Sequence, residues 1–219
     1  MSPDVLLQFA RSTGFDIALA IFTAGMLLRL IEILSLGRKP DLSEHRGSGA
    51  MGGIRTIFSR SIPRAAIFAK EPLRIINGYV MHIGLFVVIF LYGPHIEFIQ
   101  TTFGVSWPNL PSGMIDAATA ITILSLTVAL ILRMNTKTLR FLSNFGDYWA
   151  WLVTTLPVVT GYLAFNHLLL PYTLMLALHI LSIELLLISI PFSKLTHMFS
   201  FVLSRWYQGH QAGQRGIES

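Results

Sequence analysis

The sequence contains no cysteine and few charged residues. The lack of cysteine excludes disulfide bonds, thiolate metal sites, iron–sulfur ligation and cysteine catalysis within this chain. Only 12% of the 219 residues are charged, whereas a soluble domain carries about 25%. The sequence also has no internal repeat and no low-complexity tract. An ordinary soluble domain is therefore excluded.

Apolar residues make up 53% of the chain, and the mean hydropathy is +0.63. Five apolar stretches are each close to the roughly 20 residues that a membrane-spanning helix needs. They cover, approximately, residues 15–36, 75–99, 114–132, 148–165 and 170–190, and the last continues past Pro191 towards Trp206. The sequence thus predicts an all-α membrane protein with five transmembrane helices in a single domain, residues 1–219.

Basic residues are concentrated in the first and third connections and in the C-terminal segment, while the second and fourth connections have none. The positive-inside rule then places the N-terminus outside and the C-terminus in the cytoplasm. The net charge of +5 would suggest nucleic acid for a soluble protein, but here we interpret it as topology and expect no nucleic-acid partner.

Residues 54–74 alternate bases with apolar side chains, which predicts an amphipathic segment on the cytoplasmic face. Such a segment can anchor to anionic membrane lipid or form a docking surface for a cytoplasmic subunit, and these functions are compatible. Residues 207–219 are predicted to be a cytoplasmic tail.

Four of the seven histidines lie in or at the ends of the second and fifth predicted spans, at His82, His95, His179 and His197. Ionisable residues are rare within spans and mark functional sites, although a single histidine can also serve as a structural hydrogen-bonding group. Because the two spans run in opposite directions, depth pairs His82 with His197 and His95 with His179. Two facing imidazoles are the ligand set of a six-coordinate haem, which is suited to moving single electrons.

The geometry of the two helices differs. His179 and His197 stand 18 residues apart, which is five helical turns and about 27 Å on one face. His82 and His95 are 13 residues apart, which leaves them about 140° from a common face. A kink at Gly93–Pro94 could turn His95 inward, and Pro191 should bend the fifth span before His197.

The segment from His179 to His197, which ends in PFSKLTH, resembles the membrane γ subunit of respiratory nitrate reductase and related cytochrome b subunits of heterodisulfide-reductase-like complexes. The His82–Ile83–Gly84 start of span two is also similar. The resemblance implies a bacterial or archaeal cytoplasmic membrane protein with two b haems. It further implies quinol oxidation near the outer haem and electron transfer to a cytoplasmic iron–sulfur or heterodisulfide-reductase-like subunit.

One position departs from this family. In the nitrate reductase branch the second ligand on span two follows the first by ten residues, which is Tyr92 in this chain, and the histidine comes three residues later at His95. Either His95 is the ligand or the outer haem is absent. The shift also indicates a redox partner other than nitrate reductase.

Several polar residues have candidate roles around these histidines. Tyr92 and Glu97 are candidates for a quinone site, and Glu184 is a candidate for a proton path or a structural hydrogen bond. Arg29 and Glu32 are expected to pair with each other or with a haem propionate. Arg74, Lys194 and Arg205 also lie at a suitable depth to pair with the propionates of the inner haem.

We therefore expect an electron-transfer subunit of an oxidoreductase complex, without substrate chemistry beyond quinol oxidation or quinone reduction. One alternative is a haem-free membrane anchor or small transporter, in which the histidines make helix contacts. The other is a protein with one haem, held by His82 and His197.

Overall fold

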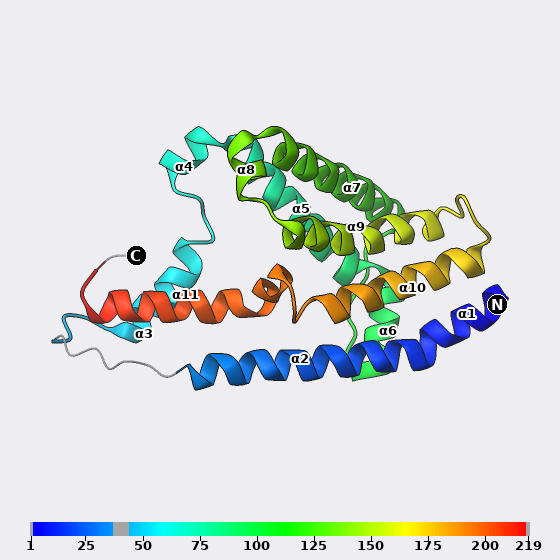
Figure 1. The fold of residues 1–219 in the computed structure, drawn as a ribbon, viewed down its shortest axis with the longest axis horizontal. Coiled ribbons are helices and arrows are strands. Elements are labelled where there is room, and N and C mark those ends of the chain that lie inside the picture. The colour runs from blue at the N-terminus through cyan, green and yellow to red at the C-terminus, as the bar shows by residue number, and fades with distance from the viewer. Residues whose placement is uncertain (1, 37–43, 218–219) are drawn as a thin grey trace.

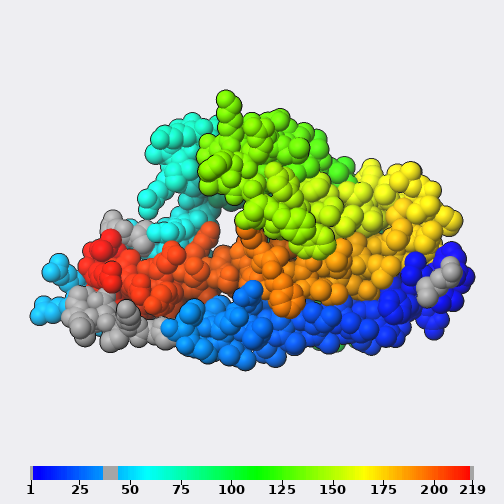
Figure 2. All heavy atoms as spheres, viewed as in Figure 1, coloured from blue at the N-terminus to red at the C-terminus, as the bar shows by residue number. Residues whose placement is uncertain are grey.

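The structure is a computed structural model that describes residues 2–36 and 44–217, and every regular element in these ranges is helical. Figure 1 shows an elongated molecule with the N- and C-termini near opposite ends of its long axis. In Figure 2, α2 (Phe15–Ser35) lies alongside α10 (Tyr172–Ser189) and α11 (His197–Gln214) over most of that length.

Five helical segments are long and apolar enough to cross a membrane. The first is continuous from Pro3 to Ser35, and consists of α1 (Pro3–Phe9), a π-helical turn η1 (Ala10–Gly14) and α2 (Phe15–Ser35). The other four are α5 (Pro72–Leu91), α7 (Ser112–Asn135), α9 (Phe145–Phe165) and α10 (Tyr172–Ser189). The all-α class is confirmed, and five helical segments of sufficient length and apolarity lie at the predicted spans; the first of them starts well before residue 15.

Local sequence signals explain where these helices begin. α9 starts with a capping box, in which the Asn144 side chain accepts from the backbone of Asp147 and the Asp147 carboxylate accepts from the backbone of Asn144. α7 and α10 begin directly after Pro111 and Pro171, whose fixed φ suits the residue before a helix. These signals define the helix starts independently of tertiary packing.

The helices form two packed groups: α5 lies against α7, and α10 lies against α9 and α2, while α7 and α9 join the groups. Close approach depends on small residues. A Cβ on Gly84 of α5 would collide with Thr122 of α7, and one on Gly25 of α2 would lie 2.6 Å from Pro191 Cβ. Leu34 and Phe86 are 66% and 62% exposed, which suits an outer surface that faces lipid.

Within the described ranges, α5 does not pack extensively against α10 or α11 (His197–Gln214). These are the elements that carry His82, His179 and His197. The ring contact of His82 with His197 therefore joins two helices that otherwise pack little against each other.

Both helix interruptions predicted from proline are confirmed. The second span ends at Leu91, because Tyr92 is extended (φ −85°, ψ 126°) and a separate helix, α6 (Gly93–Phe103), follows with Pro94 in its first turn. The predicted span of residues 75–99 is therefore two helices. The fifth span ends at Ser189, and a 3₁₀ turn, η2 (Lys194–Thr196), precedes α11.

The polar connections are more structured than predicted. Residues 54–74 are divided among α3 (Gly49–Ser59), α4 (Ala65–Lys70) and the start of α5, rather than forming one amphipathic segment. α11 extends to Gln214, so most of the predicted C-terminal tail is helical, and α3 packs along it. A further short helix, α8 (Lys137–Leu142), follows α7. Residues 218–219 of that tail, and Arg38 and Lys39 of the first connection, lie outside the described residues.

Candidate functional site

The four predicted histidines form two facing pairs. The ring centroids of His82 and His197 are 6.4 Å apart, with planes at 74°, and both side chains are exposed. The ring centroids of His95 and His179 are 6.2 Å apart, with planes at 15°. The pairing predicted from depth is therefore the pairing that the fold produces.

The two separations are suited to a metal ion between the rings. An imidazole nitrogen bonds a divalent metal at about 2.0 Å and the ring centroid lies about 1.1 Å behind it, so two rings on opposite sides of one metal have centroids about 6.2 Å apart. The observed values of 6.2 and 6.4 Å are close to this distance. Each pair has the spacing to hold one metal ion, as the two axial ligands of a haem do.

Hydrogen bonds fix the tautomer of three of the histidines. Nδ1–H of His82 donates to the Gly78 carbonyl at 2.7 Å, and Nδ1–H of His197 donates to the Lys194 carbonyl at 2.7 Å. Nδ1–H of His95 donates to Val88 at 3.0 Å. Because a carbonyl oxygen only accepts, Nδ1 carries the proton, and Nε2 of a neutral ring keeps the lone pair that a metal needs.

His179 has an equivalent arrangement through a hydroxyl group. Thr160 Oγ1 donates to the Leu156 carbonyl at 2.7 Å, and lies 3.3 Å from His179 Nδ1. With its own proton already engaged, this oxygen can accept from Nδ1–H. Gly161 leaves room for the ring, since a Cβ there would lie 2.9 Å from His179 Cε1. Thr160 and Gly161 therefore position His179 from the neighbouring helix.

The break at Tyr92 frees carbonyl groups at the end of α5, and these groups find new donors. The Phe90 carbonyl accepts from the Trp107 indole at 2.5 Å, and the Leu91 carbonyl accepts from the Leu110 backbone at 2.9 Å. Together with the bond from His95 to Val88, they satisfy a helix end that would otherwise be unpaired. The His95 ring thus helps to hold the helix break that turns this residue towards His179.

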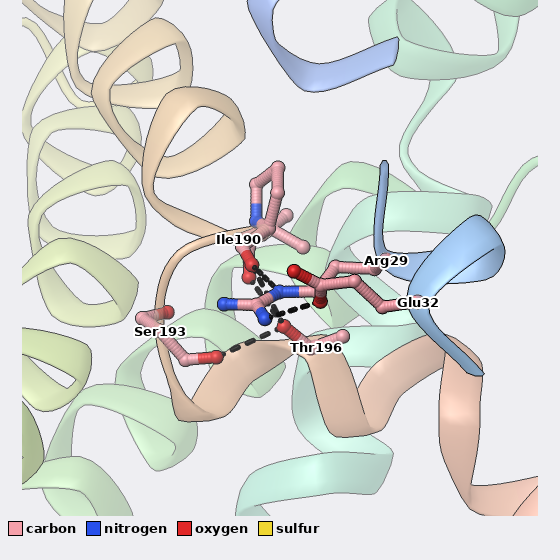
Figure 3. A network of polar contacts seen from close by, with 6 residues as sticks. Arg29, Glu32, Ile190, Ser193 and Thr196 are labelled. Atoms are coloured by element: carbon pink, nitrogen blue, oxygen red, sulfur yellow. Dashed lines mark hydrogen bonds and ion pairs between the residues drawn. The ribbon is translucent and has the colours of Figure 1, made fainter. Parts of the chain in front are cut away.

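The break after α10 is held in a similar way, as Figure 3 shows. Thr196 Oγ1 donates to the Ile190 carbonyl at 2.8 Å. Arg29 of α2 donates from Nε to the Pro191 carbonyl at 2.8 Å, and its Nη1 forms an ion pair with Glu32 at 2.7 Å. The predicted pairing of Arg29 with Glu32 is confirmed. The network fixes the turn that leads into His197.

A second ion-pair network lies next to this turn. The Asp147 carboxylate contacts Lys194 Nζ at 2.6 Å and Arg133 Nη1 at 3.1 Å. The Asp147 side chain is only 10% exposed. It therefore connects the start of α9 with the end of α7 and with η2, directly before His197.

The other predicted site residues, Tyr92 and Glu97, differ in their contacts with the histidine pairs. The Tyr92 ring is 5.0 Å from that of His95, whereas Glu97 is exposed. The three cations suggested for propionates all have partners in the chain. Arg74 pairs with Glu71 at 2.7 Å, Lys194 pairs with Asp147, and Arg205 donates to the Ser61 hydroxyl at 2.8 Å.

Sequence reasoning missed Thr160, Gly161, Asp147 and the bond from Arg29 to Pro191. A small residue beside a hydroxyl residue in the fourth span was a signal for the first two, because histidines in a membrane need close hydrogen-bonding neighbours. Among the described residues, no group of three or more histidine, aspartate or glutamate side chains could hold a bare metal ion.

A protein of Nitratidesulfovibrio vulgaris (strain Hildenborough), with the uninformative name "Protein", is 30% identical to this chain over 197 residues, which cover 88% of this chain and 87% of that protein. No protein-family model matches the sequence. No solved structure matches the chain.

Proposed function

This chain belongs to the same family as the Nitratidesulfovibrio vulgaris protein, and because that protein's name gives no activity, we propose a function from the geometry of the histidine pairs. The chain is a di-haem b subunit of a membrane oxidoreductase complex. It transfers electrons between the quinone pool and a cytoplasmic iron–sulfur or catalytic subunit.

The observation that carries this proposal is the ring separation of 6.4 Å in one pair and 6.2 Å in the other. A haem requires only two ligands from the protein, because the porphyrin supplies the other four nitrogens. Two histidines per site are therefore sufficient, and a cluster of three is not needed. A bound b haem with two imidazole ligands supplies one-electron transfer.

The protein's own residues prepare both sites for such a group. Nδ1–H of each imidazole is directed to an oxygen of the chain, which orients the ring and makes Nε2 the better ligand. Among the described residues, α5 packs little against α10 and α11, and the proposal places the haems between these helices. His82 and His197 hold the inner haem in this proposal, and His95 and His179 hold the outer one.

The proposal places the quinone beside the outer pair. Tyr92 touches His95 and has a hydroxyl that can bind a quinone oxygen, while Glu97 is exposed two residues beyond His95 and can take up a proton. His197 of the inner pair begins α11, which packs along α3. This end of the molecule is the proposed cytoplasmic side, where the iron–sulfur or heterodisulfide-reductase-like partner would dock.

The same reasoning supports membership of the nitrate reductase γ-like cytochrome b group. His95 faces His179, and Tyr92, at the position of the nitrate reductase ligand, packs at its edge. The one-turn shift of the ligand favours a partner other than nitrate reductase itself, in a bacterial or archaeal cytoplasmic membrane.

The test is a reduced-minus-oxidised spectrum of the purified protein, together with haem quantification per chain. We expect the α-band of a b haem and two haems per chain. His82→Ala and His95→Ala should each reduce the count by about one. The exposed His45 provides the matched control, and His45→Ala should keep both haems.

Other results would favour the alternatives. A protein without the α-band would be the haem-free anchor or transporter. An unchanged count in both His95→Ala and His179→Ala, with loss of haem in His82→Ala, would indicate a single haem held by His82 and His197.

A further inference from the structure

Glu184 lies on α10 on a different side from the histidine pairs. Its side chain is buried, with 7% exposure for the residue, and its Oε1 has no hydrogen-bond partner in the part of the chain that the structure describes. An ionised carboxylate without a partner is strongly disfavoured in an apolar interior. Burial without a partner therefore favours the protonated form of this carboxyl group at rest.

The side chain is directed at the π-helical turn of the first span. Both carboxylate oxygens lie 3.0 Å from the position that a Cβ on Gly14 would occupy, and Gly14 is itself buried. A π-helical turn within an α-helix is rare and frequently marks a functional site. A side chain at position 14 would press on the carboxyl group and on the Phe9 ring, which a Cβ there would approach to 3.1 Å.

The charged residues on the helices packed against α10 do not pair with the Glu184 carboxyl group. On α1, η1 and α2 these are Asp4, Arg11, Asp16, Arg29 and Glu32, and at the start of α9 it is Asp147. Arg29 pairs with Glu32, and Asp147 pairs with Lys194 and Arg133. Among the described residues, none of them makes an ion pair or a hydrogen bond with the Glu184 carboxyl group.

Two features connect this position with its surroundings. A shallow groove of about 390 Å³ opens on the preceding part of the same helix and is lined by Asp4, Leu7, Gln8, Arg11 and Ser12. On the other side of Gly14, the ring of Phe15 contacts that of Phe98 on α6 at a centroid distance of 5.4 Å. Gly14, which the Glu184 carboxyl group approaches, thus lies two residues after the groove residue Ser12 and directly before Phe15, which contacts the helix that carries His95.

We propose that Glu184 is a proton carrier between the quinone site at α6 and the polar groove of α1, an inference that rests on the proposed function. Oxidation of a quinol to a quinone releases two electrons and two protons. Haem bound at the two pairs would take up the electrons. The protonated Glu184 releases its proton to water in the groove and is protonated again by one quinol hydroxyl, while the second quinol proton passes to the exposed Glu97. The carboxyl group is then neutral again after each cycle.

The first test does not depend on haem. A hydrophobic carbodiimide reacts with protonated carboxyl groups inside membranes, so the purified chain in liposomes should be labelled at Glu184 at neutral pH, as mass spectrometry of the labelled peptide would show. Glu184→Gln should abolish this label. Glu97→Gln, which changes an exposed carboxylate, should leave it unchanged. Absence of label on Glu184 in the unmodified chain would overturn the proposal.

The second test measures the path itself. Glu184→Gln should lower the rate of haem reduction by a quinol analogue about tenfold or more, while chemical reduction by dithionite gives the same spectrum as the unmodified protein. An unchanged rate in Glu184→Gln would overturn the proton path, even if the residue is labelled. A chain without an α-band would refute the proposed function and with it the path, whereas the labelling result would still establish the protonated state of Glu184.

Discussion

Arg29 donates its Nε–H to the carbonyl oxygen of Pro191 at 2.8 Å, across 162 positions of the sequence. Proline cannot continue the hydrogen bonding of a helix interior, and the break at Pro191 leaves carbonyl groups without helical partners. Arg29 supplies one of the missing donors from α2. The first span thereby determines how the fifth span turns into His197.

Arg29→Ala should loosen this turn. The substitution removes the bond to Pro191 and leaves Glu32 without its partner, and loss of a charged hydrogen bond in a partly buried site destabilises by about 1–3 kcal/mol. We expect a lower thermal midpoint and faster hydrogen exchange over residues 190–197. Glu32→Gln keeps the bond to Pro191 and is the control. Equal exchange in the two variants would contradict the role of Arg29.

Gly161→Ala should disturb the outer pair selectively. The added Cβ would lie 2.9 Å from His179 Cε1, so the ring must move away from Thr160. We expect the haem content to fall from two to about one per chain, with the inner site unaffected. Gly113→Ala is the matched control, because a Cβ there meets nothing within 4 Å. Two haems in Gly161→Ala would show that the ring tolerates the shift.

Asp147→Asn should destabilise the junction of α7, α9 and η2. Arg133 and Lys194 both lose their carboxylate partner, and we expect a loss of about 1–3 kcal/mol, measured by thermal unfolding in detergent. Asp16→Asn also changes an acid in the first turn of a helix, but this side chain is exposed and has no ion pair in the described structure. Its midpoint should stay within about 1 °C of the unmodified protein, and an equal loss in both variants would contradict the network.

Gly209→Ala should separate α3 from α11. A Cβ at this position would collide with Thr56 and with the Gly52 carbonyl of α3. We expect faster cleavage by trypsin at Arg55 and Arg60, followed by mass spectrometry. Ala50→Ser changes an exposed position of α3 and should leave the cleavage rate unchanged. If Gly209→Ala is cleaved no faster than Ala50→Ser, the two helices do not depend on this contact.

The sequence was sufficient to predict the five spans and the pairing of histidines, because hydropathy and helix direction determine both. It could not determine the angle at Tyr92. A continuous helix would leave His82 and His95 about 140° apart, and the turn depends on tertiary hydrogen bonds from Trp107 and Leu110. The position of α3 was also missed, since packing on α11 depends on glycines that face each other only in the folded chain.

The supporting residues of the site were the hardest to predict. Thr160 and Gly161 act on His179 from another helix, and Asp147 acts through Lys194. None of these residues carries a spacing signal relative to the histidine that it supports. The four histidines could be paired from their depth along the predicted spans, whereas the residues that hold them in place depend on which helices become neighbours.

The weak packing between α5 and the α10–α11 pair has a consequence for biogenesis. The two helix groups are joined mainly through α7 and α9. If the chain binds haem as proposed, the cofactor could enter from the side, between helices that are already in the membrane. In a cell starved of haem, we expect the chain to remain open and to be removed by membrane proteases, which would couple its abundance to haem supply.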